Sequence, residues 1–467
     1  MDRAVGALLG AAAGDALGVP YEFGSRTLRP DEPAQMLGGG LGGIAPGQWS
    51  DDTEMACAIA EVAATGADLR TQEALDRIAA RFLDWYATSP PDIGVQTRQV
   101  LARTSPGEGA AARMRVVSEE LHARTGRTAG NGSLMRTSPV ALAQLGDPSA
   151  ITQAARVVSA LTHFDSMAGD ACALWCIAID HAVSTGELDL RAGLRHVDPM
   201  WADLVDEAER RKPAEFAPNN GWVVAAMQAA WSSIVRSTTL EQTLQTPVHA
   251  GGDTDTVAAI AGALAGAAYG GSTVPARWRR VLHGWPGLRS RDLTRLAVLA
   301  VGNGQCDPEG WPDVPRMPSY VGSRTTTVPH PDDPDVLLGA VGALRPGVAD
   351  AVVSLCRLGA DQAPATADPA DHVEMWIIDR EDANNALPQV LADTASVVRD
   401  LRAEGKTVFL HCVHAHTRTP VVAAAYGALI TGDTTTRALE RVLAVLPGAY
   451  PRPSIRAALA SMELPCP

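Results

Sequence analysis

Apolar residues recur every three or four positions along the first 300 residues, which is the period of an α-helix. The pattern predicts helices over residues 72–86, 110–123, 149–161, 170–183 and 221–235. Stretches typical of β-strands are nearly absent from this region. Alanine and glycine are abundant there, so we expect an all-α domain whose helices pack closely.

The pattern changes after the first 300 residues. Short apolar runs at 351–356, 374–378 and 407–410 predict buried strands, and longer periodic segments predict helices over 389–404, 421–430 and 438–446. Strands that alternate with helices are typical of an α/β domain with a mainly parallel sheet.

Proline and glycine cluster between Gly302 and Pro334, a composition typical of loops and linkers. A chain of 467 residues also exceeds the usual size of a single hydrophobic core. We therefore predict a helical domain over residues 1–302, a linker over 303–318 and an α/β domain over 319–467.

Two acidic clusters lie about 200 residues apart, and each opens an apolar, helical run. Ser, Asp and Thr at a helix start are ordinary N-caps, and either cluster alone is more typical of a cap than of a metal site. However, a cap needs one oxygen, whereas each cluster supplies several. The pair therefore predicts a site for one or two hard cations such as Mg²⁺. The candidate ligands are Ser50, Asp51, Asp52, Asp253, Asp255 and Thr256.

These clusters, together with several short blocks, resemble the ADP-ribosylglycohydrolase family in order and spacing. The other matching blocks are residues 6–22, 130–136, 162–163 and 221–224. The resemblance covers about residues 1–300. It implies hydrolysis of the bond at the anomeric carbon of an ADP-ribosyl group, with two Mg²⁺ ions, or Mn²⁺ in their place, near the ribose.

The resemblance also assigns roles to individual residues. Glu22 has an acid/base or substrate-gating role, with an exposed loop carboxylate as the alternative, and Asp52 counts as catalytic as well as metal-binding. His163 contacts the substrate or is a hydrogen-bonded structural histidine. A backbone-rich contact to the diphosphate or ribose, or a simple polar turn, is formed by Gly130, Asn131, Gly132 and Ser133.

A second motif follows the predicted strand that ends at Cys412, with Arg418 and Thr419 six and seven residues later. A thiolate is the nucleophilic form of cysteine. A loop that enters a helix turns its N–H groups toward an anion, and an arginine binds phosphate with two parallel hydrogen bonds. This Cys-x5-Arg-Thr segment is similar to the active-site loop of tyrosine and dual-specificity phosphatases.

The phosphatase resemblance implies a general acid on a neighbouring loop. Asp379 is the predicted acid, with Asp382 as the second choice. The motif departs from the family at Ala415, where a glycine is usual. Both alternatives therefore stay open: a cysteine-dependent phosphatase, or a domain that binds phosphate and turns over poorly.

The formal net charge of −14 argues against an extended nucleic-acid-binding surface. No apolar stretch reaches the length of a membrane span, and seven scattered cysteines favour a reducing compartment, so we expect a cytoplasmic protein without a membrane partner. The expected substrates are an ADP-ribosylated protein, nucleic acid or small molecule for the first domain and a phosphorylated molecule for the second. Two other functions remain open: an ADP-ribose- and phosphate-binding protein, and a phosphatase with an accessory metal domain.

Overall fold

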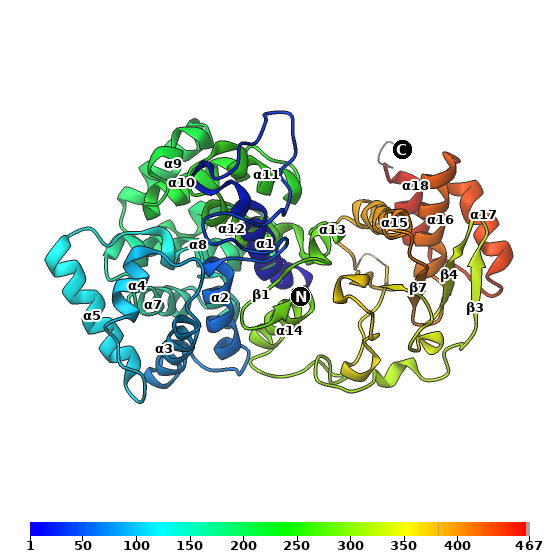
Figure 1. Ribbon diagram of the computed structural model, residues 1–467, viewed down its shortest axis with the longest axis horizontal. Coiled ribbons are helices and arrows are strands. Elements are labelled where there is room, and N and C mark those ends of the chain that lie inside the picture. The colour runs from blue at the N-terminus through cyan, green and yellow to red at the C-terminus, as the bar shows by residue number, and fades with distance from the viewer. Residues whose placement is uncertain (382, 464–467) are drawn as a thin grey trace. The chain divides into compact units, whose positions relative to one another are not determined.

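The computed structural model of the protein describes residues 1–381 and 383–463. The chain forms two compact units (Figure 1). Unit 1 comprises Met1–Val274 and Val281–Gln305, and unit 2 comprises Pro275–Arg280 and Cys306–Pro467. Residues 306–318, within the predicted linker, group with unit 2. Independent folding of the two units stays a prediction.

Unit 1 is helical, apart from a ribbon of two short antiparallel strands. The predicted helices are found as α3, α5, α7, α8 and α10, with ends that shift by up to four residues. The elements are α1 (Asp2–Gly18), α2 (Asp51–Ala63), α3 (Gln72–Ala87), α4 (Val95–Leu101), α5 (Ala110–Thr125), α6 (Ser138–Ala143), α7 (Pro148–Ser159), α8 (Ser166–Thr185), α9 (Met200–Arg210), α10 (Val223–Ile234), α11 (Leu240–Ala250), α12 (Thr254–Tyr269), α14 (Ser290–Val301), β1 (His283–Gly284) and β2 (Leu288–Arg289).

Helices α1 and α12 form the centre of unit 1 because glycines allow their backbones to touch. A Cβ atom placed on Gly10 would lie 2.2 Å from the carbonyl oxygen of Gly262. One placed on Gly18 would lie 2.3 Å from the Cα of Asp255. Glycines every fourth residue along α1 therefore set the distance at which the C-terminal end of α1 meets the acidic start of α12.

One segment, Asp2–Gly24, is long and apolar enough by composition to cross a membrane, and its apolar window is fully buried inside the protein. This segment contains α1, whose neighbours are the other helices of unit 1. Burial of this kind is also typical of the core helix of a globular domain.

Unit 2 contains a five-stranded sheet in the order β3-β4-β7-β5-β6. Strand β3 pairs antiparallel with β4, and all other pairs are parallel, which confirms the mainly parallel sheet. The elements are α13 (Ala276–Arg279), β3 (Thr327–His330), β4 (Asp333–Ala340), β5 (Ala351–Ser354), β6 (His372–Glu374), α15 (Leu387–Ala403), β7 (Val408–Cys412), α16 (Arg418–Thr431), α17 (Thr435–Val445) and α18 (Pro453–Ser461).

The strand predictions need three corrections, the first of which is that strand β3 was not predicted. The strand predicted over 374–378 is β6, which ends at Glu374, so only one residue of that run is in a strand. Strand β4 was not predicted, because Pro334 lies at its start and the prolines before it favour a loop. Only the later residues of β4, such as Val336 and Leu338, are buried, beside β7.

Both faces of the sheet are covered, as expected for parallel strands. Alternate residues, such as Val408 and Leu410, join the cluster formed with α15 and α16 (Figure 1). The opposite face carries Val352 and Phe409 in a smaller cluster. Helix α13 also belongs to this unit: the Ala276 N–H donates to Asp393 Oδ2 at 2.8 Å, and Arg280 pairs with Glu404.

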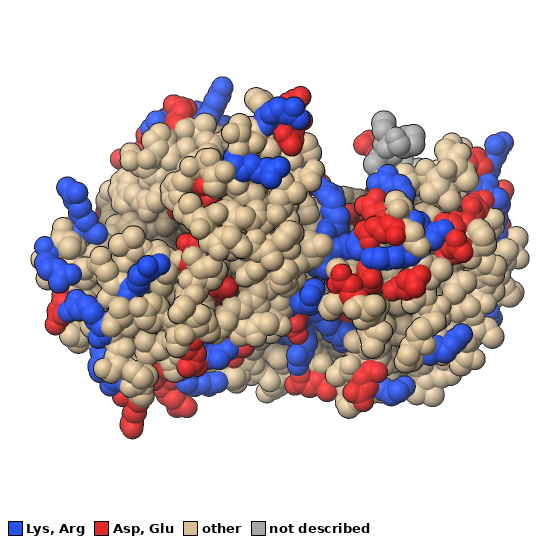
Figure 2. All heavy atoms as spheres, in the orientation of Figure 1, with Lys and Arg blue, Asp and Glu red and all other residues tan. Residues whose placement is uncertain are grey.

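Charged side chains of both signs are mixed on the face of the protein that Figure 2 shows. Lys and Arg are scattered over unit 1 in this view, and in unit 2 they alternate with Asp and Glu. Within unit 2, Lys406 pairs with both Asp371 and Glu404. The predicted lack of an extended nucleic-acid-binding surface stays a prediction.

Candidate functional site

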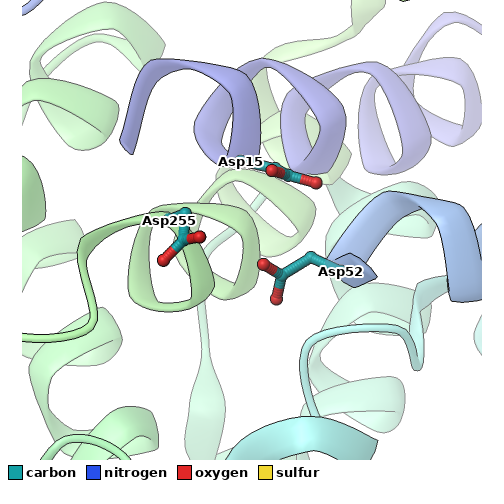
Figure 3. A group of neighbouring side chains, drawn as sticks. All are labelled: Asp15, Asp52 and Asp255. Carbon is teal, nitrogen blue, oxygen red and sulfur yellow. The ribbon is translucent and has the colours of Figure 1, made fainter. Parts of the chain in front are cut away.

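Three carboxylates converge in unit 1 from three different helices. Asp15 lies on α1, Asp52 at the start of α2 and Asp255 in the first turn of α12, and their side chains face a common space (Figure 3). One oxygen of each lies within 4.8 Å of the others. The fold therefore brings together the two acidic clusters that are about 200 residues apart in the sequence.

Asp15 fixes the start of α2. Its Oδ1 accepts hydrogen bonds from the N–H and the hydroxyl of Ser50, both at 2.8 Å, and its Oδ2 accepts from the N–H and hydroxyl of Thr53 at 3.0 and 2.6 Å. Asp15 was not among the predicted site residues. A single aspartate inside an otherwise apolar run was the sequence signal that could have identified it.

The residues at the helix starts do not act as ordinary N-caps. Ser50 and Asp253 are the N-cap residues of α2 and α12, yet neither side chain makes a capping hydrogen bond within the described chain. Instead, Ser50 Oγ also contacts Asp52 Oδ2 at 3.1 Å, and Thr256 Oγ1 lies 3.5 Å from the same oxygen. The Ser50 hydroxyl therefore contacts an acidic side chain and not the helix backbone, which weighs against the capping interpretation for this residue.

A second acidic group shares Asp255 with the first. Oxygens of Glu22, Asp92 and Asp255 also lie within 4.8 Å of one another. Glu22 is buried in the short turn Val19–Gly24 after α1, so the exposed-loop alternative for this residue is wrong. Asp92 was not predicted, because it lies in an irregular Pro-Pro-Asp-Ile-Gly segment without helical or strand periodicity.

Crowding and burial make the ionised forms of these acids costly. Desolvation, followed by neighbouring carboxylates, raises the pKa of Glu22 to about 9 and the pKa of Asp52 and Asp255 well above the ordinary value. Burial likewise raises the pKa of Asp15 to about 6, although hydrogen bonds from Thr53 and Ser50 oppose it. A bound cation would favour the ionised form of these carboxylates.

The donor set fits a hard divalent cation. All candidate ligands are carboxylate or hydroxyl oxygens, which Mg²⁺ and Mn²⁺ prefer. Asp52 Oδ1 is buried and has no hydrogen-bond partner among the described residues. An acceptor buried in this way is normally satisfied by a donor or an ion, and Asp52 is thus suited to metal binding.

The predicted substrate loop lies against His163. A Cβ on Gly130 or Gly132 would come within 3.3 or 3.0 Å of the His163 imidazole, so glycine allows the loop to pack on this ring. Asn131 points to the acidic centre, and its Nδ2 donates to Asp253 Oδ2 at 2.7 Å. Ser133 is buried, and its hydroxyl accepts from Ser159 at 2.9 Å.

His163 is buried and hydrogen-bonded. Its Nδ1 lies 2.7 Å from the hydroxyl of Thr162, and burial together with the charge of Arg136 lowers the pKa of His163 to about 3. A neutral imidazole that supports the substrate loop agrees with the structural alternative for this residue. A direct contact with the substrate stays a prediction.

The cysteine motif of unit 2 forms a turn between β7 and α16. Cys412 is the last residue of β7, and Arg418 is the first residue of α16. Ala415, between them, has φ +57°, so this position adopts the left-handed conformation that glycine favours. An alanine at this position therefore carries backbone strain that a glycine would avoid.

Burial has the largest influence on Cys412 and raises the pKa of its thiol. The positive charge of Arg418 and hydrogen bonds from Thr419 and the backbone of Ala415 outweigh burial, and the pKa lies below the ordinary value. By contrast, burial raises the pKa of the nearby Cys356 thiol to about 12. The motif therefore favours a thiolate at Cys412 but not at Cys356.

Arg418 has a buried donor without a partner among the described residues. Its Nη1 donates to the carbonyl oxygens of Leu355 and Ile377 at 3.1 and 3.0 Å, whereas its Nε is buried and has no partner in the described structure. Asp379 lies beside this loop, because its Oδ2 accepts from Thr417 at 2.8 Å and its Oδ1 from Arg452 at 2.8 Å. Asp382, the second candidate acid, lies outside the described residues.

Comparison with known proteins agrees with the geometry of unit 1. Residues 1–307 match the ADP-ribosylglycohydrolase family, and the chain belongs to this family. The family defines the class of activity, which is hydrolysis of ADP-ribosyl linkages. Unit 2 lies almost entirely beyond the matching residues.

Two bacterial relatives illustrate the range of the family. The chain is 31% identical to an ADP-ribosyl-[dinitrogen reductase] glycohydrolase of Rhodospirillum rubrum, over 59% of this chain and 89% of the relative. It is 30% identical to the ADP-ribosylarginine hydrolase Tri1 of Pseudomonas putida (strain GB-1), over 60% of this chain and 73% of the relative.

Solved structures give more distant matches. An ADP-ribosylglycohydrolase-related protein complex is 28% identical with a TM-score of 0.49, over 65% of this chain and 98% of that chain. The human protein DUSP28 is 21% identical with a TM-score of 0.23, over 29% of this chain and 88% of that chain.

Proposed function

We propose that unit 1 is a Mg²⁺-dependent hydrolase that cleaves the bond between ADP-ribose and an arginine side chain. The observation that carries the proposal is the convergence of Asp15, Asp52 and Asp255 from three helices. Arginine is the first acceptor to test, because one relative is an ADP-ribosylarginine hydrolase. Free cysteines throughout the described chain support a cytoplasmic location.

The residues that would hold the metal are the six oxygen-bearing residues predicted from the sequence, all of which are buried: Ser50, Asp51, Asp52, Asp253, Asp255 and Thr256. When bound, Mg²⁺ would supply Lewis-acid chemistry for the ribose hydroxyls and water. Asp15 also positions Ser50 and Thr53, since both its oxygens accept hydrogen bonds from them.

The remaining groups act on the substrate. Cleavage at the anomeric carbon develops oxocarbenium character, so the leaving nitrogen needs a proton and the ribose needs a delivered water. Glu22 and Asp92 lie beside Asp255 and are the candidates for these proton transfers. The glycine-rich loop at Asn131 would present backbone N–H groups to the diphosphate, with His163 as its support.

Metal removal and acceptor choice test this function together. We expect EDTA-treated protein to release no ADP-ribose from ADP-ribosylarginine, and Mg²⁺ to restore release. Mg²⁺ at 100 times its Kd is also expected to add about 2.7 kcal/mol to the free energy of unfolding. Sodium chloride at equal ionic strength is the control. Full turnover in excess EDTA with no retained metal would contradict the proposal, and tight ADP-ribose binding without turnover would favour the binding-protein alternative.

A second candidate function, a cysteine-dependent phosphatase, is favoured by the free, buried Nε of Arg418. An anion at the start of α16 would satisfy this donor, and the helix dipole and the loop amides favour negative charge there. In the proposed reaction, Cys412 Sγ attacks phosphorus to form an S–P bond, the P–O bond breaks, and the leaving oxygen takes its proton from Asp379. Water then attacks phosphorus and gives a proton to the Asp379 carboxylate, while the S–P bond breaks to release phosphate and the Cys412 thiolate.

Cysteine alkylation tests the anion site without requiring turnover. We expect iodoacetamide to modify Cys412 near neutral pH, because its pKa is lowered. Phosphate or vanadate should protect it. Cys356 is the internal control, since its raised pKa predicts slow modification. Mass spectrometry that finds no difference between the two cysteines, and no protection by phosphate, would show that the loop is not an anion site.

A further inference from the structure

Asn220 lies where three functional segments of unit 1 meet. It follows the short turn Ala217–Asn219 and is buried, with 3% of its surface exposed. Its side chain and backbone contact the loop that carries Asp253 and the loop that carries Asn131. Sequence analysis gave no role to this residue.

The carboxamide of Asn220 binds the acidic loop at two points. Oδ1 accepts from the N–H of Asp253 at 2.9 Å, and Nδ2 donates to the carbonyl oxygen of Gly251 at 3.1 Å. The intervening Gly252 has φ +79°, and a Cβ there would lie 2.5 Å from Asn220 Oδ1. The loop therefore lies flat against Asn220, and the direction of the Asp253 side chain depends on this contact.

A closed set of hydrogen bonds links this loop to the substrate loop. Asn131 Nδ2 donates both to Asp253 Oδ2 at 2.7 Å and to the backbone carbonyl of Asn220 at 3.0 Å. The N–H of Asn131 also donates to Gly221 at 3.1 Å. Asn220, Asp253 and Asn131 thus contact one another in a ring, and a shift of one moves the other two.

The turn that carries Glu22 joins the same loop from the other side. The N–H of Phe23 donates to the carbonyl oxygen of Gly252 at 2.8 Å. An open hollow of about 440 Å³ lies between Phe23 and the segment that contains Asn220 and Gly221. The position of residues 251–253 therefore determines where both Glu22 and the substrate loop lie.

We propose that Asn220 is a positioning residue that fixes the Asp253 loop and the Asn131 loop relative to each other. The affinities for metal and for ADP-ribose then both depend on its carboxamide. This inference rests on the proposed function, because it takes Asp253 to be a metal ligand. Outer partners of this kind usually change metal affinity by about 10- to 100-fold when they are removed.

The test compares two adjacent asparagines in the full chain. Asn220→Ala removes both side-chain hydrogen bonds, whereas Asn220→Asp keeps the size and the acceptor but loses the donor to Gly251. Asn219, the exposed neighbour, gives the matched controls Asn219→Ala and Asn219→Asp. Calorimetric titration with Mn²⁺ alone, and with ADP-ribose in Mg²⁺ and in EDTA, measures the two affinities.

We expect both Asn220 variants to weaken Mn²⁺ and ADP-ribose binding by about 10-fold or more, with native circular dichroism, and the Asn219 variants to stay within about twofold of wild type. ADP-ribose binding should weaken in EDTA as well, because Asp253 also holds Asn131. A folded Asn220→Ala or Asn220→Asp protein with unchanged affinities would overturn this inference alone. Wild-type protein that binds no Mn²⁺ would overturn the proposed function with it, and loss of the fold in both variants would make Asn220 a structural residue.

Discussion

Replacing Asp255 with asparagine is expected to reduce ADP-ribosyl hydrolase turnover by more than about 100-fold. Removal of a residue that only holds a metal ligand can already cost about 100-fold, and Asp255 is itself a proposed ligand. Asp255 belongs to both acidic groups, with Asp15 and Asp52 on one side and with Glu22 and Asp92 on the other. Asparagine keeps the shape but removes one negative charge and one oxygen, so both groups are altered by a single change.

Asp147→Asn is the matched control, because Asp147 is an exposed N-cap of α7 and asparagine caps a helix equally well. The measurement is initial release of ADP-ribose at saturating Mg²⁺, together with Mn²⁺ titration of both variants. If the Asp255→Asn protein has wild-type turnover and metal affinity, Asp255 is not part of the metal site. Reduced turnover in Asp147→Asn would show that the assay reports stability instead.

Gly10→Ala is expected to destabilise unit 1 by about 3 kcal/mol, the upper end of the usual cost of overpacking. The added methyl group would lie 2.2 Å from the Gly262 carbonyl oxygen, and the atoms it meets are backbone. Alanine favours the helix by about 1 kcal/mol relative to glycine, and steric overlap must exceed this gain. Because α1 and α12 also carry Asp15 and Asp255, we expect metal affinity to fall with stability.

Gly169→Ala serves as the control for Gly10→Ala, since Gly169 also lies inside a helix, α8, and the atom nearest to a Cβ there is in the flexible Arg156 side chain, at 3.3 Å. Chemical denaturation followed by fluorescence reports the free energy of unfolding, and alkylation of Cys412 reports unit 2 separately. Equal stability of the Gly10→Ala and wild-type proteins would mean that the α1–α12 contact relaxes at little cost.

The helical part of the fold was predictable because its signal is local. Periodic segments such as 72–86 and 110–123 have a buried face and long unbroken runs, and their helices were found close to the predicted bounds. Strand β4 was missed, since a strand whose first half is exposed and begins near prolines lacks a continuous apolar run. Its pairing with β7 brings together residues about 70 positions apart in the sequence, which no local pattern records.

The acidic centre was predictable only in part. Ser50, Asp52 and Asp255 stood out because oxygen-bearing residues are crowded at two helix starts. Asp92 could not be identified, since an aspartate in a proline-rich segment is most often a turn residue. Its proximity to Glu22 is a property of the tertiary fold.

Helix α13 is expected to hold the chain together after a single proteolytic cleavage. Residues 275–280 belong to unit 2 although they lie between two parts of unit 1, so the backbone passes between the units three times. A protease that cleaves once between Asn303 and Gln305 would leave two fragments, and the larger would still carry α13. Arg280 and the N–H of Ala276 would continue to bind Glu404 and Asp393 of the smaller fragment. A nicked protein would therefore remain one particle in native size-exclusion chromatography, and the two pieces could be expressed separately as a split protein that reassembles through a single turn of helix.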